Sequence, residues 1–102
     1  MDWNKPENKA LIKAILTLKN ADEARRFLRD LLTPDEIREF AKRFQTAEML
    51  AENIPYSAIE RKTGLSSTTV ARVSKWLNGK EGGYRSVISK LHHHSVPVAR
   101  GD

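Results

Sequence analysis

The chain has 102 residues, of which 39% are apolar and 30% charged, and it contains no cysteine, so we expect one compact domain without disulfides, thiol catalysis or cysteine-ligated metal. No apolar stretch approaches the roughly 20 residues of a bilayer span, and the start lacks a signal-peptide profile, which predicts a soluble cytoplasmic protein with no membrane partner. The net charge of +5 arises from Asn53 onwards, where eight basic residues accompany three acidic ones, whereas the preceding part carries ten of each.

The first two predicted helices carry wide apolar faces. Apolar residues recur at intervals of three and four from Glu7 to Lys19, which predicts a helix that Asn20 ends. A second apolar face extends from Ala24 to Leu32. Both faces cover more than half of the helix circumference, which is more than a chain of this length can readily hide, so a second copy is the expected partner. Burial within the monomer is the alternative.

The third predicted helix has a strong start signal. Thr33 is placed to cap it, Pro34 suits the first helical position, and Glu36 can return a hydrogen bond to the cap. The apolar period then continues to about Glu52, and Pro55 follows. The sequence therefore predicts one long helix in this region.

The segment from Tyr56 to Leu77 predicts a helix-turn-helix. A short helix over Tyr56–Lys62 precedes a turn centred on Gly64, which can adopt the positive φ that a tight turn needs. Ser66 is expected to cap the second helix. The apolar residues spaced to pack the two helices together are Ile59, Leu65, Val70 and Val73, and the buried stripe of the second helix is predicted to include Trp76 and Leu77.

The chain is expected to end in a short helix and a disordered tail. Asn78 and Gly79 end the preceding helix, Tyr84–Leu91 can form one more, and the low apolar content of His92–Asp102 predicts disorder. No strand pattern occurs, so the predicted fold class is all-α. We expect one domain over residues 1–91, divided into dimerisation helices (5–54), a helix-turn-helix (55–78) and a short extension (79–91), followed by the tail (92–102).

The helix after the turn has a polar face suited to DNA. Short hydroxyls at its start can enter the major groove, Arg72 can form two hydrogen bonds to a guanine edge, and Lys75 can neutralise phosphate. The basic second half of the chain also fits a polyanionic partner. The predicted DNA-contacting residues are Tyr56, Ser57, Lys62, Ser66, Ser67, Thr68, Thr69, Ala71, Arg72 and Lys75.

The run from Leu31 to Leu77 resembles the tryptophan repressor superfamily, and more closely its uncharacterised tryptophan repressor-like branch. The residues that carry this resemblance are Leu31, Leu32, Thr33, Pro34, Asp35, Glu36, Arg43, Gly64, Thr69 and Arg72. The resemblance implies an intertwined homodimer, in which helices from both chains build one core and two helix-turn-helix heads project from it.

The same resemblance implies an effector site, for which the candidates are Thr33, Arg43 and Arg72. Arg43 can instead pair with Glu39 or Glu48 on its own helix. Val73 follows Arg72 where the tryptophan repressor has a glycine, and this branched side chain narrows the space for an indole. We therefore expect no tryptophan corepressor and no cofactor, and the identity of any other effector stays open.

The function predicted from these features is sequence-specific binding of double-stranded DNA by a homodimeric transcriptional regulator that acts as a repressor. The alternative is a protein-interaction module whose helix-turn-helix is structural only. RNA binding is disfavoured, because an RNA reader needs aromatic stacking platforms. The aromatics expected on core faces instead are Phe27, Phe40, Phe44 and Trp76.

Catalysis and metal binding find little support in the sequence. It contains no glycine-rich phosphate loop and no nucleophile elbow, so we predict that the protein is not an enzyme. The consecutive His92, His93 and His94 cannot converge on one metal ion from a helix. We therefore predict no metal site.

Overall fold

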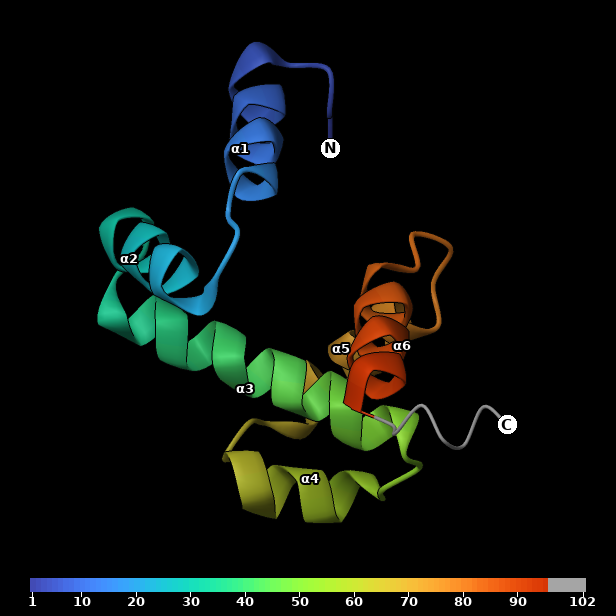
Figure 1. The fold of residues 1–102 in the computed structure, drawn as a ribbon. Helices are drawn as coiled ribbons and strands as arrows, with labels where there is room; N and C mark the ends of the chain where they lie inside the picture. The colour runs from blue at the N-terminus through green and yellow to red at the C-terminus, as the bar shows by residue number, and fades with distance from the viewer. Residues whose placement is uncertain (96–102) are drawn as a thin grey trace. The chain divides into compact units, whose positions relative to one another are not determined.

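The computed structural model describes residues 1–95, with the side chains of residues 1–92, and in this part of the chain it contains helices and no strand (Figure 1). The helices are α1 (Pro6–Leu16), α2 (Ala21–Leu31), α3 (Pro34–Ala51), α4 (Tyr56–Thr63), α5 (Ser67–Leu77) and α6 (Gly83–Ser95). The predicted all-α class is confirmed. None of the helices in residues 1–95 combines the length and the apolar character that a membrane span requires.

The chain divides into two compact units, one over Met1–Ile37 and the other beginning at Arg38. The first unit contains α1 and α2, and neither helix has a buried residue. Large apolar side chains are instead exposed on both helices; they are Leu11, Ile12, Ile15, Leu16, Leu28 and Leu31. The first unit therefore has wide apolar faces that its own residues leave uncovered. The predicted domain subdivision remains a prediction.

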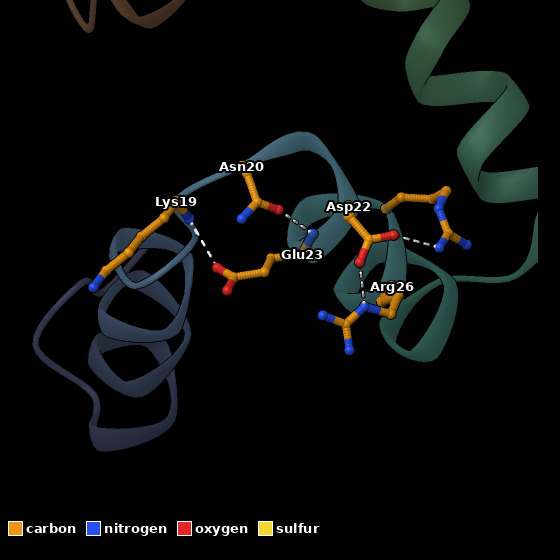
Figure 2. Close-up of polar contacts among 6 residues, drawn as sticks. Lys19, Asn20, Asp22, Glu23 and Arg26 are labelled. Atoms are coloured by element: carbon orange, nitrogen blue, oxygen red, sulfur yellow. Dashed lines mark hydrogen bonds and ion pairs between the residues drawn. The ribbon is translucent and has the colours of Figure 1, made fainter.

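The junction between α1 and α2 differs from the predicted one. Helix α1 stops at Leu16, three residues earlier than expected, and the Thr17 hydroxyl donates to the Ala14 carbonyl oxygen at 2.7 Å. Asn20 does not end α1 but caps α2, because its Oδ1 accepts the Glu23 N–H at 2.9 Å (Figure 2). The Glu23 carboxylate accepts the main-chain N–H of Lys19 at 3.0 Å in return. The first bond satisfies one of the N–H groups that a helix start leaves without a partner, and the second holds the residue just before the cap.

The start of α3 has the predicted cap. Thr33 Oγ1 accepts the Glu36 N–H at 3.1 Å, and the Glu36 carboxylate accepts the Thr33 N–H at 2.9 Å. Pro34 is the first residue of the helix. The helix ends at Ala51, after which Asn53 adopts a φ of 62°, a left-handed conformation that asparagine tolerates well among residues with a side chain.

The second unit has its own apolar core. Ala47 of α3, Val73 and Leu77 of α5, and Ile88 of α6 form a buried cluster. The partly buried residues packed against it are Phe44, Leu50 and Tyr84, and the Phe44 and Tyr84 rings lie 6.3 Å apart. Helix α5 contacts both α4 and α6. The recognition helix predicted from the sequence is therefore held from several sides within one unit.

Two predictions about aromatic side chains are wrong. Trp76 is 45% exposed and Phe40 is 42% exposed, although both were expected on core faces. Adjacent residues of a helix point about 100° apart, so Leu77 turns into the core and Trp76 turns away from it. Phe40 lies on the part of α3 before the core cluster begins, where its ring faces the guanidinium of Arg43 at 5.4 Å.

The disordered tail was predicted to begin at His92, which is too early in the chain. Helix α6 continues to Ser95, so residues 92–95 are helical. Histidine and serine are only moderately worse helix formers than leucine, and residues 84–96 contain no glycine or proline that would interrupt the helix. The rest of the predicted tail, residues 96–102, lies outside the described residues.

Candidate nucleic-acid interface

The turn between α4 and α5 depends on Gly64. Its φ of 77° is left-handed, and its N–H donates to the Glu60 carbonyl oxygen at 2.8 Å. Thr63 supports the turn from within, because its hydroxyl donates to the Ile59 carbonyl oxygen at 2.8 Å and accepts the Leu65 N–H at 3.2 Å. The predicted positive φ at this glycine is confirmed, and the turn connects α4 to α5.

Helix α5 begins with the predicted cap. Ser66 Oγ accepts the Thr69 N–H at 3.2 Å and donates to Thr69 Oγ1 at 3.1 Å. Ser67 and Thr68 are exposed, and their hydroxyls make no hydrogen bond within the described part of the chain. Ser66 and Thr69 therefore maintain the helix start, whereas the two hydroxyls between them are available to a ligand.

Three fully buried apolar residues orient α5. Ile59 from α4 and Val70 and Val73 from α5 all have 0% exposure, and α4 contacts α5 as predicted. Val73 also belongs to the cluster with Ala47, Leu77 and Ile88. Leu65, between α4 and α5 in the sequence, is half-buried. Because the buried face is fixed, the opposite face of α5 is fixed as well.

The exposed face of α5 brings together four of the predicted DNA-contacting residues. An open depression on this face is lined by Thr68, Ala71, Arg72, Lys75 and Trp76. In the described part of the chain, neither Arg72 nor Lys75 pairs with a carboxylate. Their positive charge is therefore uncompensated and faces solvent.

The electrostatics of the helix starts reinforce this charge. Helices α1, α2 and α3 each carry an acidic residue in the first turn, whereas α4 and α5 carry none. A helix N-terminus bears a partial positive charge and unpaired N–H groups, which favour a nearby anion. The start of α5 thus leaves its positive end open beside exposed hydroxyls.

The remaining predicted contacts lie elsewhere on the unit. Ser57 and Lys62 are exposed on the first and last turns of α4. Tyr56 is 42% exposed but lines a separate depression with residues such as Ser74, Asn78 and Arg85. Four of the DNA-contacting residues predicted on α5 therefore line one depression, whereas those predicted on α4 lie outside it.

Sequence reasoning missed Arg85. Its Nη1 donates to the carbonyl oxygens of Leu77, at 2.5 Å, and of Gly79, at 2.8 Å. These carbonyls lie at and just after the end of α5, so a side chain of α6 caps the end of α5. An arginine six to eight residues downstream carries no sequence signal for such a role.

The sequence matches the family described as Trp repressor protein over residues 7–92. The chain belongs to the Trp repressor family. Its uncharacterised relative YerC from Bacillus subtilis is 38% identical over 81 residues, which cover 79% of this chain and 78% of YerC.

Solved structures of similar proteins agree with this assignment to the Trp repressor family. A TrpR-like protein from Eubacterium eligens is 40% identical, with a TM-score of 0.82 over 88% of this chain and 93% of its own. A protein proposed to be a Trp repressor from Staphylococcus aureus is 30% identical, with a TM-score of 0.82 over 90% and 95% of the two chains. The predicted uncharacterised, Trp repressor-like branch is thereby confirmed.

Two of the three effector residues predicted for this member of the Trp repressor family have other partners. Thr33 uses its hydroxyl in the cap of α3. Arg43 is half-buried, its Nε lies 3.6 Å from a carboxylate oxygen of Glu39, and its guanidinium lies over the Phe40 ring. This confirms the predicted alternative pairing with Glu39. Arg72 has no ion pair and no side-chain hydrogen bond among the described residues. The effector site remains a prediction.

Among the side chains of residues 1–92, no group of three or more histidine or acidic residues is arranged to hold a metal ion. The side chains of His93 and His94 lie outside that part of the chain.

Proposed function

We propose that this member of the Trp repressor family binds double-stranded DNA as a homodimer and represses transcription. Family membership supports a DNA-binding regulator in general. The observation that carries the proposal is the exposed face of α5, where Arg72 and Lys75 have no acidic partner within the described residues. Unpaired cations on a rigidly held helix fit a polyanion.

The two kinds of DNA contact fall to different residues of α5. Ser67 and Thr68 present free hydroxyls at the helix start, where short side chains allow close approach to base edges. Arg72 lies one turn after Thr68 and can bond a guanine through two N–H groups. Lys75 supplies a point charge for phosphate, which contributes affinity for any sequence.

The homodimer is proposed from the first unit. No residue of α1 or α2 is buried, and Leu16 is 77% exposed while Ile15 is 48% exposed. Apolar faces of this extent are stabilised when another surface covers them, and a second copy can pair with itself through a two-fold axis. Two symmetry-related heads require a near-palindromic site with half-sites about one helical turn, or roughly 34 to 36 Å, apart.

A salt titration tests DNA binding most directly. Fluorescence anisotropy of a labelled random-sequence duplex should show affinity falling by orders of magnitude between roughly 50 and 200 mM salt, because several phosphate contacts per dimer release counterions. A salt response close to flat contradicts the proposal. If the affinity does fall with salt, selection of bound fragments from a random duplex pool would define the operator.

The exposed apolar faces of α1 and α2 also favour a second candidate, a module that binds a different protein. In that case the helix-turn-helix serves only to build the second unit. Such a module has no need for unpaired cations on α5, so it should show weak duplex binding even at low salt. The same titration therefore separates the two candidates.

A further inference from the structure

Trp76 is the largest side chain on the exposed face of α5. It is 45% exposed and lines the same depression as Arg72 and Lys75. The core of the second unit does not use it, because Val73 and Leu77 fill that role. A half-exposed indole between uncompensated cations lies where a partner surface can cover it.

The position of Trp76 along the helix indicates which part of DNA it can reach. Trp76 lies eight residues after Thr68, which corresponds to about 12 Å along a helix axis, and the major groove of B-DNA is also roughly 12 Å wide. When the start of α5 enters the groove, the other end of the face comes to the groove edge. The sugar-phosphate backbone runs along that edge.

We propose that Trp76 contacts the DNA backbone, with its ring on a deoxyribose and its Nε1–H donating to a phosphate oxygen. This inference rests on the proposed function. Indole offers an apolar face and a single donor, with no acceptor for a base edge to recognise. The flanking cations Arg72 and Lys75 select a polyanion over a neutral apolar surface.

The contact is therefore expected to stabilise every duplex alike. Removing the indole should lower affinity for operator and random DNA by the same factor. That behaviour distinguishes Trp76 from Arg72, whose replacement is expected to change base preference.

Fluorescence of single-tryptophan variants tests the contact. The chain contains two tryptophans, so Trp3→Phe leaves Trp76 as the only one and Trp76→Phe leaves Trp3 as the matched control. We expect a labelled-strand duplex to bind both variants, to quench the emission of Trp76, and to protect Trp76 from acrylamide. The emission of Trp3 should stay unchanged.

Affinity measurements give an independent readout. Trp76→Phe keeps a ring but removes the donor, so it should weaken duplex binding roughly tenfold, the loss expected when a hydrogen bond to a charged group disappears. Trp76→Ala also removes the ring contact and should weaken binding further. Circular dichroism should show unchanged helix content for both variants, because the side chain lies outside the buried cluster.

Three results would overturn the proposed contact between Trp76 and the DNA backbone. If anisotropy shows duplex binding while Trp76 is shielded from acrylamide before DNA is added and its emission does not respond, a second copy covers the indole and the inference fails. If both substitutions leave duplex affinity unchanged, it also fails. If no variant and no wild-type protein binds duplex, the proposed function fails and this inference fails with it.

Discussion

Arg85 donates a hydrogen bond of 2.5 Å to the carbonyl oxygen of Leu77, the last residue of α5. The same Nη1 also reaches Gly79 at 2.8 Å. A helix leaves its final carbonyls without intrahelical partners, and here one guanidinium from α6 satisfies two acceptors. The end of the recognition helix is thereby tied to the helix that follows it.

Replacing Arg85 by alanine should destabilise the second unit. We expect the free energy of unfolding to fall by roughly 1 to 2 kcal/mol, since hydrogen bonds from a charged donor are stronger than neutral ones although these are partly exposed to water. Urea unfolding measures the loss. Lys90→Ala on the same helix is the control, because Lys90 is exposed and its side chain makes no bond within the described residues; equal losses for both variants would argue against the tie.

Gly64→Ala should destabilise the turn through backbone conformation alone. A Cβ at this position meets nothing within 4 Å, so steric contact is not the cause. The φ of 77° is the cause, and it should cost about 1 to 2 kcal/mol for a residue with a side chain. Gly83→Ala is the matched control, since Gly83 has equally open surroundings without a positive φ. Its thermal midpoint should stay equal or rise, and a fall as large as that of Gly64→Ala would contradict this account.

Arg72→Ala and Lys75→Ala should affect DNA binding differently. Loss of Arg72 is expected to cost about 1 to 3 kcal/mol on the operator and to relax the preference at one base position. Loss of Lys75 should weaken all duplexes about equally and reduce the salt dependence by about one phosphate contact. Competition binding with single-base operator variants measures both effects. Equal, sequence-independent losses would mean that Arg72 contacts phosphate only.

A charge on the apolar face of α2 should disrupt the dimer and, with it, the fold of the first unit. Leu28 is 41% exposed in the single chain, so Leu28→Asp is harmless if the protein is a monomer. We expect instead that the substitution abolishes the dimer and that the wild-type unfolding midpoint rises with protein concentration.

The control for the dimer experiment is Asp30→Ala, which changes charge on the opposite side of α2 from Leu28. Analytical ultracentrifugation should find this variant dimeric. A stable, soluble monomer carrying Leu28→Asp would refute the predicted dimer interface.

Free tryptophan should not switch DNA binding on. Val73 is fully buried in the core beside Arg72, and Arg43 is paired with Glu39. A ligand shifts a conformational equilibrium only by its differential affinity for the two states, and the branched Val73 together with the Arg43–Glu39 pair should lower that affinity for tryptophan. Calorimetry should detect no saturable tryptophan binding. Saturable binding together with tighter operator affinity would overturn the prediction.

The features that sequence predicted well are local. Thr33 and Glu36, or Ser66 and Thr69, are three residues apart, so a helix start brings each pair together whatever the rest of the chain does. Gly64 directly follows a predicted helix, where a glycine can adopt the positive φ that ends the helix. Such signals need no knowledge of tertiary structure.

The features that sequence missed depend on what else packs nearby. Asn20 suits both the end of one helix and the start of another, and only the position of Glu23 decided for the start. The buried stripe predicted for α5 was too wide, because it included both Trp76 and Leu77, and the pattern cannot say which of the two points into the core. Arg85 acts across a loop, where no periodicity applies.

The same distinction applies to the candidate site. A single helix fixes the relative positions of Thr68, Ala71, Arg72 and Lys75, so their common face follows from the 3.6-residue period. Tyr56 belongs to another helix, and its place on a separate depression depends on the angle between α4 and α5. That angle is set by buried contacts that the sequence indicates only in outline.

The lack of any buried residue in α1 and α2 has a consequence for gene dosage. The second unit has a core of its own, so single chains can hold a folded recognition helix while the first unit still awaits a partner. For the proposed homodimer, mass action makes the number of dimers grow with the square of the chain concentration while dimers are scarce. A doubling of synthesis would then raise the amount of DNA-binding species about fourfold, which gives a steeper response to expression level than a monomeric regulator can produce.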